Sequence, residues 1–216
     1  MNRPHICSIA FLLLLSGCSA KKPFSYEVID YSNNEGCNPF NIGHRLGGDL
    51  PGNTDNTLQA MDSVASMQID GCFKYSEFDV GQSADGLVVW HDMHVNQSPL
   101  LYKASAELPA YVPSLEQLYH GFKTHDVIRP IVIDLKYIPD KRYWPELKSY
   151  AEQLQLANDV PVWFITSARM VEVYAEICEL ITPEFDIRLY AGKGDFCEVV
   201  KAYFQLKSEQ TVAEPM

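Results

Sequence analysis

Short apolar runs alternate with longer helical patterns along the middle of this chain, and no other feature constrains its fold as strongly. Runs rich in β-branched and aromatic residues predict strands, and apolar residues that recur with helical spacing predict helices. We expect strands near residues 40–43, 74–80, 87–91, 130–135, 161–166 and 185–190. We expect helices near residues 56–68, 113–121, 143–157, 168–180 and 195–206. This alternation is typical of an α/β fold with a mostly parallel sheet.

The N-terminal residues have the pattern of a secretory signal. Arg3 supplies a short positive start, and residues 6–15 are almost uniformly apolar. At about ten residues this run is too short to span a bilayer, which needs about twenty. It ends in the sequence LSGC, which closes on Cys18 and resembles the bacterial lipobox, where a peptidase cuts before a lipidated cysteine. An ordinary signal peptide with a chance cysteine is the alternative interpretation.

These features define the expected domain organisation. We expect a lipoprotein signal peptide over residues 1–17, a lipidated cysteine and tether over 18–38, one folded domain over 39–207, and a disordered tail over 208–216. Ser19 follows the cysteine, which in lipoprotein sorting implies the outer membrane where the cell has one. The expected location is therefore the bacterial cell envelope, with the chain lipid-anchored at the periplasmic face of the outer membrane.

The chain has six cysteines, and four remain after the expected processing. These are Cys37, Cys72, Cys178 and Cys197, an even number in a compartment that permits disulfides. Cys37 and Cys72 each precede a predicted strand, so they could form a disulfide if those strands are neighbours. Four buried free thiols are the alternative, and no C-x-x-C or Cys/His spacing supports a metal site.

The formal net charge of −11 constrains the partners. Nucleic acid and an anionic bilayer are not attracted electrostatically to such a surface, so we expect no nucleic-acid partner. An anionic substrate must be attracted by cations that lie close to the site.

Two strands carry charged residues on one face. Glu77 and Asp79 are two positions apart on a predicted strand, so both carboxylates point to the same side of the sheet. Adjacent carboxylates repel unless they are exposed or bridged by a cation, and oxygen ligands suit a hard ion such as Mg²⁺ or Ca²⁺. Asp134 and Lys136 have the same spacing on an apolar strand. Asp134 could complete a three-carboxylate metal site and Lys136 could contact a phosphate oxygen, or the two could form a structural salt bridge.

In chain order, the polar pairs between residues 44 and 136 resemble the glycerophosphodiester phosphodiesterase family. The resemblance covers residues 40–136 well and extends more weakly to residue 190. Its specificity lies in the ordered set, because no single pair is specific. The pairs are His44/Arg45, Asn56/Thr57, Glu77/Asp79, His91/Asp92, the segment from Pro113 to Glu116, and Asp134/Lys136.

The resemblance implies a TIM-barrel-like (β/α) fold whose site lies at the C-terminal ends of the strands. It also implies roles for seven of the matched residues. These are an acid/base pair of His44 and His91, a divalent-cation site (Mg²⁺ or Ca²⁺) of Glu77, Asp79 and Asp134, and a phosphate site of Arg45 and Lys136.

Phosphodiester chemistry accounts for a histidine beside an arginine. Cleavage of a phosphodiester needs charge neutralisation and a proton donor close together. Arg45 offers a planar fork to phosphate oxygens, and His44 can exchange a proton near neutral pH. We expect the glycines that follow, Gly47 and Gly48, to give the substrate room.

Three residues depart from the usual family pattern. Leu46 stands where the family usually has a third glycine, and Asp55 stands where it usually has glutamate. Asp134 also replaces a glutamate, and the sequence Asp-Leu-Lys resembles the sphingomyelinase D and phospholipase D branch of the same superfamily. Aspartate can still bind a metal, although its carboxylate reaches about one methylene less far than that of glutamate.

Length is the remaining constraint. A complete barrel takes about 250 residues and at least about 200, whereas this chain has six predicted strands, so we expect the barrel to be shortened at its C-terminal end. The expected function is metal-dependent hydrolysis of glycerophosphodiesters or lysophospholipid-like substrates to an alcohol and a phosphomonoester. The alternatives are an inactive envelope lipoprotein that keeps a reduced barrel for binding, and a phospholipase D-like lyase that forms a cyclic phosphate.

Overall fold

The computed structural model describes residues 43–48, 50, 52–65, 75–125 and 129–192, and in the C-terminal region residues 196, 198–200, 202–203 and 205–206. Cys18, Cys37 and Cys72 lie outside these ranges, as does most of the expected strand at 40–43. Cys178 is disulfide-bonded, which removes the interpretation of four free thiols. In the part of the chain that is described, no helix is both long and apolar enough to cross a membrane.

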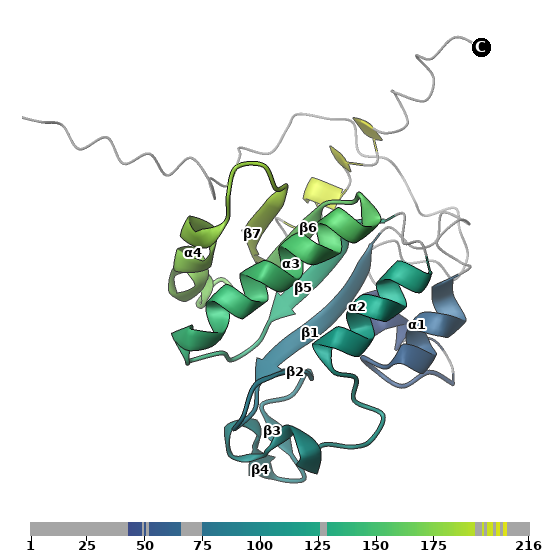
Figure 1. Cartoon of the computed structure of the whole chain (residues 1–216), viewed down its shortest axis with the longest axis vertical. Coiled ribbons are helices and arrows are strands. Elements are labelled where there is room, and N and C mark those ends of the chain that lie inside the picture. Colours follow the sequence, from purple (N-terminus) through teal and green to yellow (C-terminus); the bar gives the residue numbers. More distant parts are fainter. Residues whose placement is uncertain are drawn as a thin grey trace, which may run out of the picture.

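One mixed sheet forms the centre of the fold (Figure 1), so the predicted α/β class is confirmed. Its strand order is β2-β1-β5-β6-β7. All neighbours pair in parallel except β2, which forms an antiparallel hairpin with β1. The strands are β1 Ser76–Gln82, β2 Leu87–Val89, β5 Ile131–Leu135, β6 Val162–Thr166 and β7 Ile187–Ala191.

Four helices pack on the same face of this sheet. They are α1 Leu58–Ala65, α2 Leu115–Thr124, α3 Trp144–Asn158 and α4 Val171–Leu180. Ser114 caps α2 by accepting a hydrogen bond from the backbone N–H of Gln117, whose side chain in turn accepts from the Ser114 N–H. Residues of all four helices belong to one hydrophobic cluster, so the helices share a single core with the sheet.

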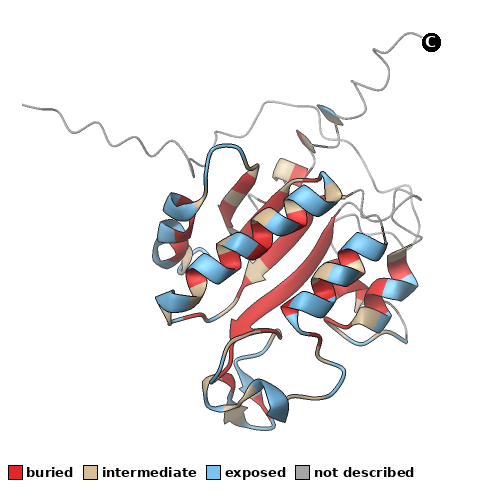
Figure 2. Ribbon diagram, viewed as in Figure 1, coloured by how far each residue is buried: buried red, intermediate tan, exposed pale blue. Residues whose placement is uncertain are grey.

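Strand alternation separates the two faces. Phe78, Ile133 and Phe164 are fully buried on the helix-covered face. Because side chains alternate along a strand, their neighbours Glu77, Asp79 and Asp134 point to the opposite face. Figure 2 illustrates the result, with buried residues along the strands and along the inner sides of the helices.

The opposite face is covered by aromatic side chains and by residues of the C-terminal segment. Trp163 and Tyr190 lie on neighbouring strands, with ring centroids 6.2 Å apart. Phe196 packs against both rings and against Tyr75, and Val200 joins the same cluster. Trp163 and Tyr190 therefore contribute to core packing.

Between β2 and α2 the chain forms a small irregular lobe that the sequence pattern did not predict. It contains a two-stranded hairpin and two short 3₁₀ turns, and it lies beside the end of β1 in Figure 1. These elements are β3 His94–Val95, β4 Ser98–Pro99, η3 Leu100–Tyr102 and η4 Ser105–Glu107. Two further 3₁₀ turns are η1 His44–Gly47 and η5 Lys141–Tyr143.

Candidate metal and phosphate centre

The turn η1 brings the His-Arg pair onto the edge of β1. The Gly43 carbonyl accepts a hydrogen bond from the Glu77 N–H at 2.8 Å, so the turn starts beside that strand. Gly43 has a φ of +88°, and a Cβ there would lie 1.9 Å from the Tyr75 carbonyl oxygen. Only glycine fits this position. Arg45 and Leu46 follow with left-handed φ values of 50° and 60°.

The two glycines after the turn permit close packing. A Cβ on Gly47 would lie 2.5 Å from a methyl group of Val64 in α1. A Cβ on Gly48 would lie 2.4 Å from a carboxylate oxygen of Asp55. These glycines therefore allow the turn to pack closely against Val64 of α1 and against Asp55.

Three carboxylates converge on the face of the sheet opposite the helices. Asp79 and Asp134 are registered partners on the parallel strands β1 and β5, and Glu77 lies two positions before Asp79. One oxygen from each carboxylate lies within 4.8 Å of the others. Ligands about 2.0 to 2.6 Å from a common Mg²⁺ or Ca²⁺ ion would be separated by distances of this size.

Burial makes this cluster electrostatically costly without a cation. Glu77 Oε2 accepts a hydrogen bond from the Arg45 N–H at 2.6 Å, whereas Oε1 is buried and has no hydrogen-bond partner among the described residues. Burial, and then repulsion by Asp79, raise the pKa of Glu77 well above its usual range. Burial likewise raises the pKa of Asp134. The donor set and the free oxygen of Glu77 fit a hard divalent ion.

Lys136 lies between two of the three carboxylates. Its ammonium group is 2.8 Å from Asp79 Oδ1 and 2.8 Å from Asp134 Oδ2. Burial alone would lower the pKa of Lys136, but the two carboxylates outweigh it and raise the pKa, so the ammonium stays charged. The salt bridge considered from the sequence is present, and it includes Asp79 as well.

Arg45 extends from the carboxylates to the second histidine. Its guanidinium donates to Asp55 Oδ2 at 2.5 Å and contacts His91 Nε2 at 2.8 Å. Arginine is always a donor, so His91 Nε2 accepts and carries the lone pair. The proton then resides on Nδ1, which lies 2.7 Å from Asp92 Oδ1. Asp92 and Arg45 thus select one tautomer of a neutral His91.

His44 approaches the cluster from η1. Its Nε2 lies 4.0 Å from Glu77 Oε2, beyond hydrogen-bond length, and its side chain is 18% exposed. The two histidines therefore reach the cluster by different contacts, His44 at Glu77 and His91 through Arg45. The structure brings together all seven residues that the sequence assigned to acid/base chemistry, metal and phosphate. Cys18, Cys37 and Cys72 lie outside the described residues.

Asn56 is a site residue whose role the sequence did not reveal. Its side-chain amide donates to Asp79 Oδ2 at 2.8 Å, and its amide oxygen accepts from the Asp79 N–H at 3.1 Å. Its own N–H donates to the Arg45 carbonyl at 2.9 Å. The residue has a φ of 57°, and asparagine tolerates this left-handed conformation better than most side chains do. The available sequence signal for this residue was an asparagine at the predicted start of a helix.

No protein-family model matches the chain, and no curated protein matches it either.

Proposed function

We propose that this protein is a metal-dependent phosphodiesterase that hydrolyses glycerophosphodiesters or lysophospholipid-like diesters to an alcohol and a phosphomonoester. The observation that carries the proposal is the buried triad of Glu77, Asp79 and Asp134 within 4.8 Å. Arg45 and Lys136 contact the triad and match a phosphodiester in charge. Structural salt bridges alone do not require a third buried carboxylate with a free oxygen.

Charge counting favours a divalent ion in the triad. Arg45 and Lys136 face the triad and Asp55, so four carboxylates outnumber two cations when all are ionised. A bound Mg²⁺ or Ca²⁺ would make up this difference and would polarise a phosphoryl oxygen. Glu77, Asp79 and Asp134 would hold the ion, and Lys136 would neutralise the phosphate beside it.

Arg45 couples phosphate binding to the release of a base. In the substrate-free protein, the Arg45 guanidinium covers the lone pair of His91 Nε2. A phosphate that takes over this guanidinium frees Nε2 to accept a proton from the attacking water. The water oxygen bonds to phosphorus as the ester bond to the alcohol breaks, and His44 supplies the proton that the leaving alkoxide needs.

The fold proposed for this chemistry is a (β/α) barrel shortened at its C-terminal end. Support comes from the parallel strands β1, β5, β6 and β7, which follow one another in the sheet, and from the four helices on one face. The triad occupies the face that would be interior in a barrel. Phe196 and Val200 of the C-terminal segment cover part of this face, where further strands would lie in a complete barrel.

A non-catalytic envelope protein is the second candidate. Its support is the Lys136 ammonium, which already bridges Asp79 and Asp134 at 2.8 Å without a metal. In that case the cluster would hold β1 and β5 together, and the protein would serve for binding or structure. A cyclising lyase is the other candidate within the enzyme class: there a hydroxyl of the substrate attacks phosphorus in place of water, and the product is a cyclic phosphate.

One assay separates these functions. Purified protein is stripped of metal and incubated with a panel of glycerophosphodiesters, with and without Mg²⁺ or Ca²⁺. We expect hydrolysis that needs the ion and that falls by at least about 100-fold in Asp79→Asn, while Asp62→Asn, at an exposed position of α1, retains activity. Phosphorus NMR of the product distinguishes a phosphomonoester from a cyclic phosphate. Absence of ion-dependent turnover on every diester would favour the non-catalytic candidate.

A further inference from the structure

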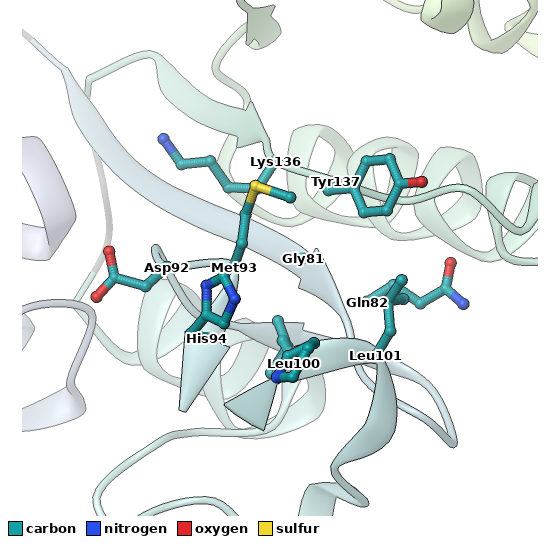
Figure 3. Close-up of a pocket in the computed structure, with 10 residues that line it drawn as sticks. Gly81, Gln82, Asp92, Met93, His94, Leu100, Leu101, Lys136 and Tyr137 are labelled. Atoms are coloured by element: carbon teal, nitrogen blue, oxygen red, sulfur yellow. The ribbon is translucent and has the colours of Figure 1, made fainter. Parts of the chain in front are cut away.

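The irregular lobe between β2 and α2 forms one wall of a cavity beside the triad. The cavity has a volume of about 240 Å³. Its walls are mostly apolar and come from the end of β1, from the lobe and from the residues after β5. Figure 3 draws its lining, which includes Met93, Leu100, Leu101 and Tyr137.

Lys136 joins this cavity to the triad. Its ammonium lies 2.8 Å from Asp79 and Asp134, while the residue also lines the cavity. In Figure 3 the Lys136 ammonium and the Asp92 carboxylate point to the same side, away from Tyr137. Asp92 is also the partner of His91 Nδ1. The cavity therefore has a charged end at Lys136 and Asp92, while Leu101, Tyr137 and Gln82 lie at its other end.

Two side chains at this cavity are exposed although they are large and apolar. Met93 is 57% exposed and Tyr137 is 42% exposed. Folding gains little from apolar groups left in water, and such groups around a pocket are typical of ligand sites. Gly81 forms another part of the lining, and a Cβ there would lie 3.1 Å from a methyl group of Leu100. A side chain at that position would reduce the cavity.

We propose that this cavity binds the apolar part of the alcohol in the substrate, so that the preferred substrates are phosphodiesters of short alkyl alcohols. The proposal deepens the proposed function and rests on it for the chemistry. A phosphate held at Lys136 places its ester substituent at the charged end of the cavity. An alkyl chain that continues from it meets Met93 and the leucines, whereas a strongly polar alcohol would lose hydration there. The volume is below the range of about 300–1,000 Å³ for drug-sized ligands, so the cavity takes a short length of chain.

Binding of n-alkyl phosphates tests the cavity independently of turnover. Methyl, propyl and hexyl phosphate are titrated into purified protein with Mg²⁺, and the affinities are measured by calorimetry. We expect affinity to rise about two- to fourfold for each methylene that enters the cavity, and to stop rising when the chain exceeds it. Equal affinities for methyl and hexyl phosphate would overturn the proposal.

Exposed positions supply the variants, so the fold is preserved. Met93→Ser and Tyr137→Ser should flatten the dependence on chain length, so that hexyl phosphate gains much less affinity over methyl phosphate than in the wild type. The matched controls are Leu156→Ser and Tyr111→Ser, which remove similar exposed side chains elsewhere, at 73% and 53% exposure. If affinity still rises with alkyl chain length in the cavity variants, the alkyl group binds at another surface and the proposal is overturned.

Turnover is then measured on glycerol phosphodiesters with the same alkyl chains. Chain-dependent binding without turnover would support the cavity and refute the phosphodiesterase. Turnover with no preference for longer alkyl chains, together with equal affinities for methyl and hexyl phosphate, would support the phosphodiesterase and refute alkyl binding in the cavity.

Discussion

Asn56 and Asp79 form a pair of hydrogen bonds that joins the turn before α1 to the centre of β1. The Asn56 amide donates to Asp79 Oδ2 at 2.8 Å and accepts from the Asp79 backbone at 3.1 Å. Both residues are buried, so the paired groups are shielded from competing water. One Asp79 oxygen is thereby oriented by Asn56, while the other faces Lys136.

Removing the Asn56 side chain should therefore weaken metal binding. Asn56→Gly keeps the left-handed backbone and deletes both hydrogen bonds to Asp79. We expect Mg²⁺ affinity to fall about 10- to 100-fold, the usual effect of losing a group that orients a metal ligand. The measurement is calorimetric titration of metal-stripped protein.

Asn96→Gly is the matched control. Asn96 also has a left-handed φ, 48°, but it is exposed in the turn between β3 and β4. Its replacement changes the backbone in the same way without touching Asp79. Equal effects of the two variants would mean that Asn56 does not orient the carboxylate.

Glu77→Gln should separate stability from metal binding. Burial and Asp79 raise the pKa of Glu77, so removal of its charge relieves repulsion in the metal-free protein. We expect the Tm of the metal-free variant to equal or exceed that of the wild type, and the rise in Tm on adding Mg²⁺ to disappear. Glu116→Gln, on the exposed side of α2, is the control and should keep the full metal-induced rise. A variant that Mg²⁺ still stabilises would remove Glu77 from the ligand set.

Cys18→Ser tests the proposed envelope anchor. If the LSGC sequence directs lipidation, the wild type should enter the detergent phase, and the variant should become soluble or remain unprocessed. Fractionation of cells that produce each form provides the measurement. A wild type that is soluble without detergent would contradict the anchor.

The sequence predicted most of the architecture because the relevant signals are local. Alternation along β1 predicted that Glu77 and Asp79 share a face, and this depends only on the geometry of a strand. Helical spacing located α1 to α4 within a few residues of their observed ends. The β3–β4 hairpin was not predicted, because strands of two residues are too short to display a period.

Relations between distant segments could not be derived in this way. The register that sets Asp79 beside Asp134 depends on how two strands far apart in the chain pair. The contact of Arg45 with His91 requires a left-handed turn at Arg45, and local propensity does not favour such a turn in arginine. The cover that Phe196 gives to Trp163 is a consequence of packing and leaves no periodic signal in either segment.

Tyr150 offers a test of the core. Its ring packs edge-on against Phe78 at 6.3 Å, and its hydroxyl is buried without a hydrogen-bond partner among the described residues. Tyr150→Phe keeps the ring and removes the unsatisfied group, so we expect the free energy of unfolding to be unchanged or to rise by about 1 kcal/mol. Denaturant titration at neutral pH provides the measurement. A loss of more than about 1 kcal/mol would show that the hydroxyl has a partner.

The same substitution predicts a change in alkaline stability. Burial raises the pKa of Tyr150 far above its ordinary value near 10. Above about pH 10 the unfolded chain loses this proton while the folded protein retains it, so stability falls as pH rises. Tyr150→Phe should make this fall shallower than in the wild type, whereas Tyr111→Phe, at an exposed position, should leave it unchanged.

The two histidines provide the test of catalysis. His44 lies 4.0 Å from Glu77, and His91 accepts from Arg45. His44→Ala and His91→Ala should each lower kcat by about 10²- to 10⁴-fold, the usual effect of losing a general acid or base. Mg²⁺ affinity should remain near that of the wild type, because the three carboxylates are retained.

His120→Ala is the control, because His120 is exposed on α2, and its activity should match that of the wild type. Rates are compared on a diester that the wild type turns over, and metal affinity is measured on the same preparations. If both alanine variants stay within a few-fold of the wild type, the cleavage does not use these histidines as proton carriers. If instead both activity and Mg²⁺ affinity fall together, the histidines organise the metal centre, and the acid/base assignment is wrong even though the site is catalytic.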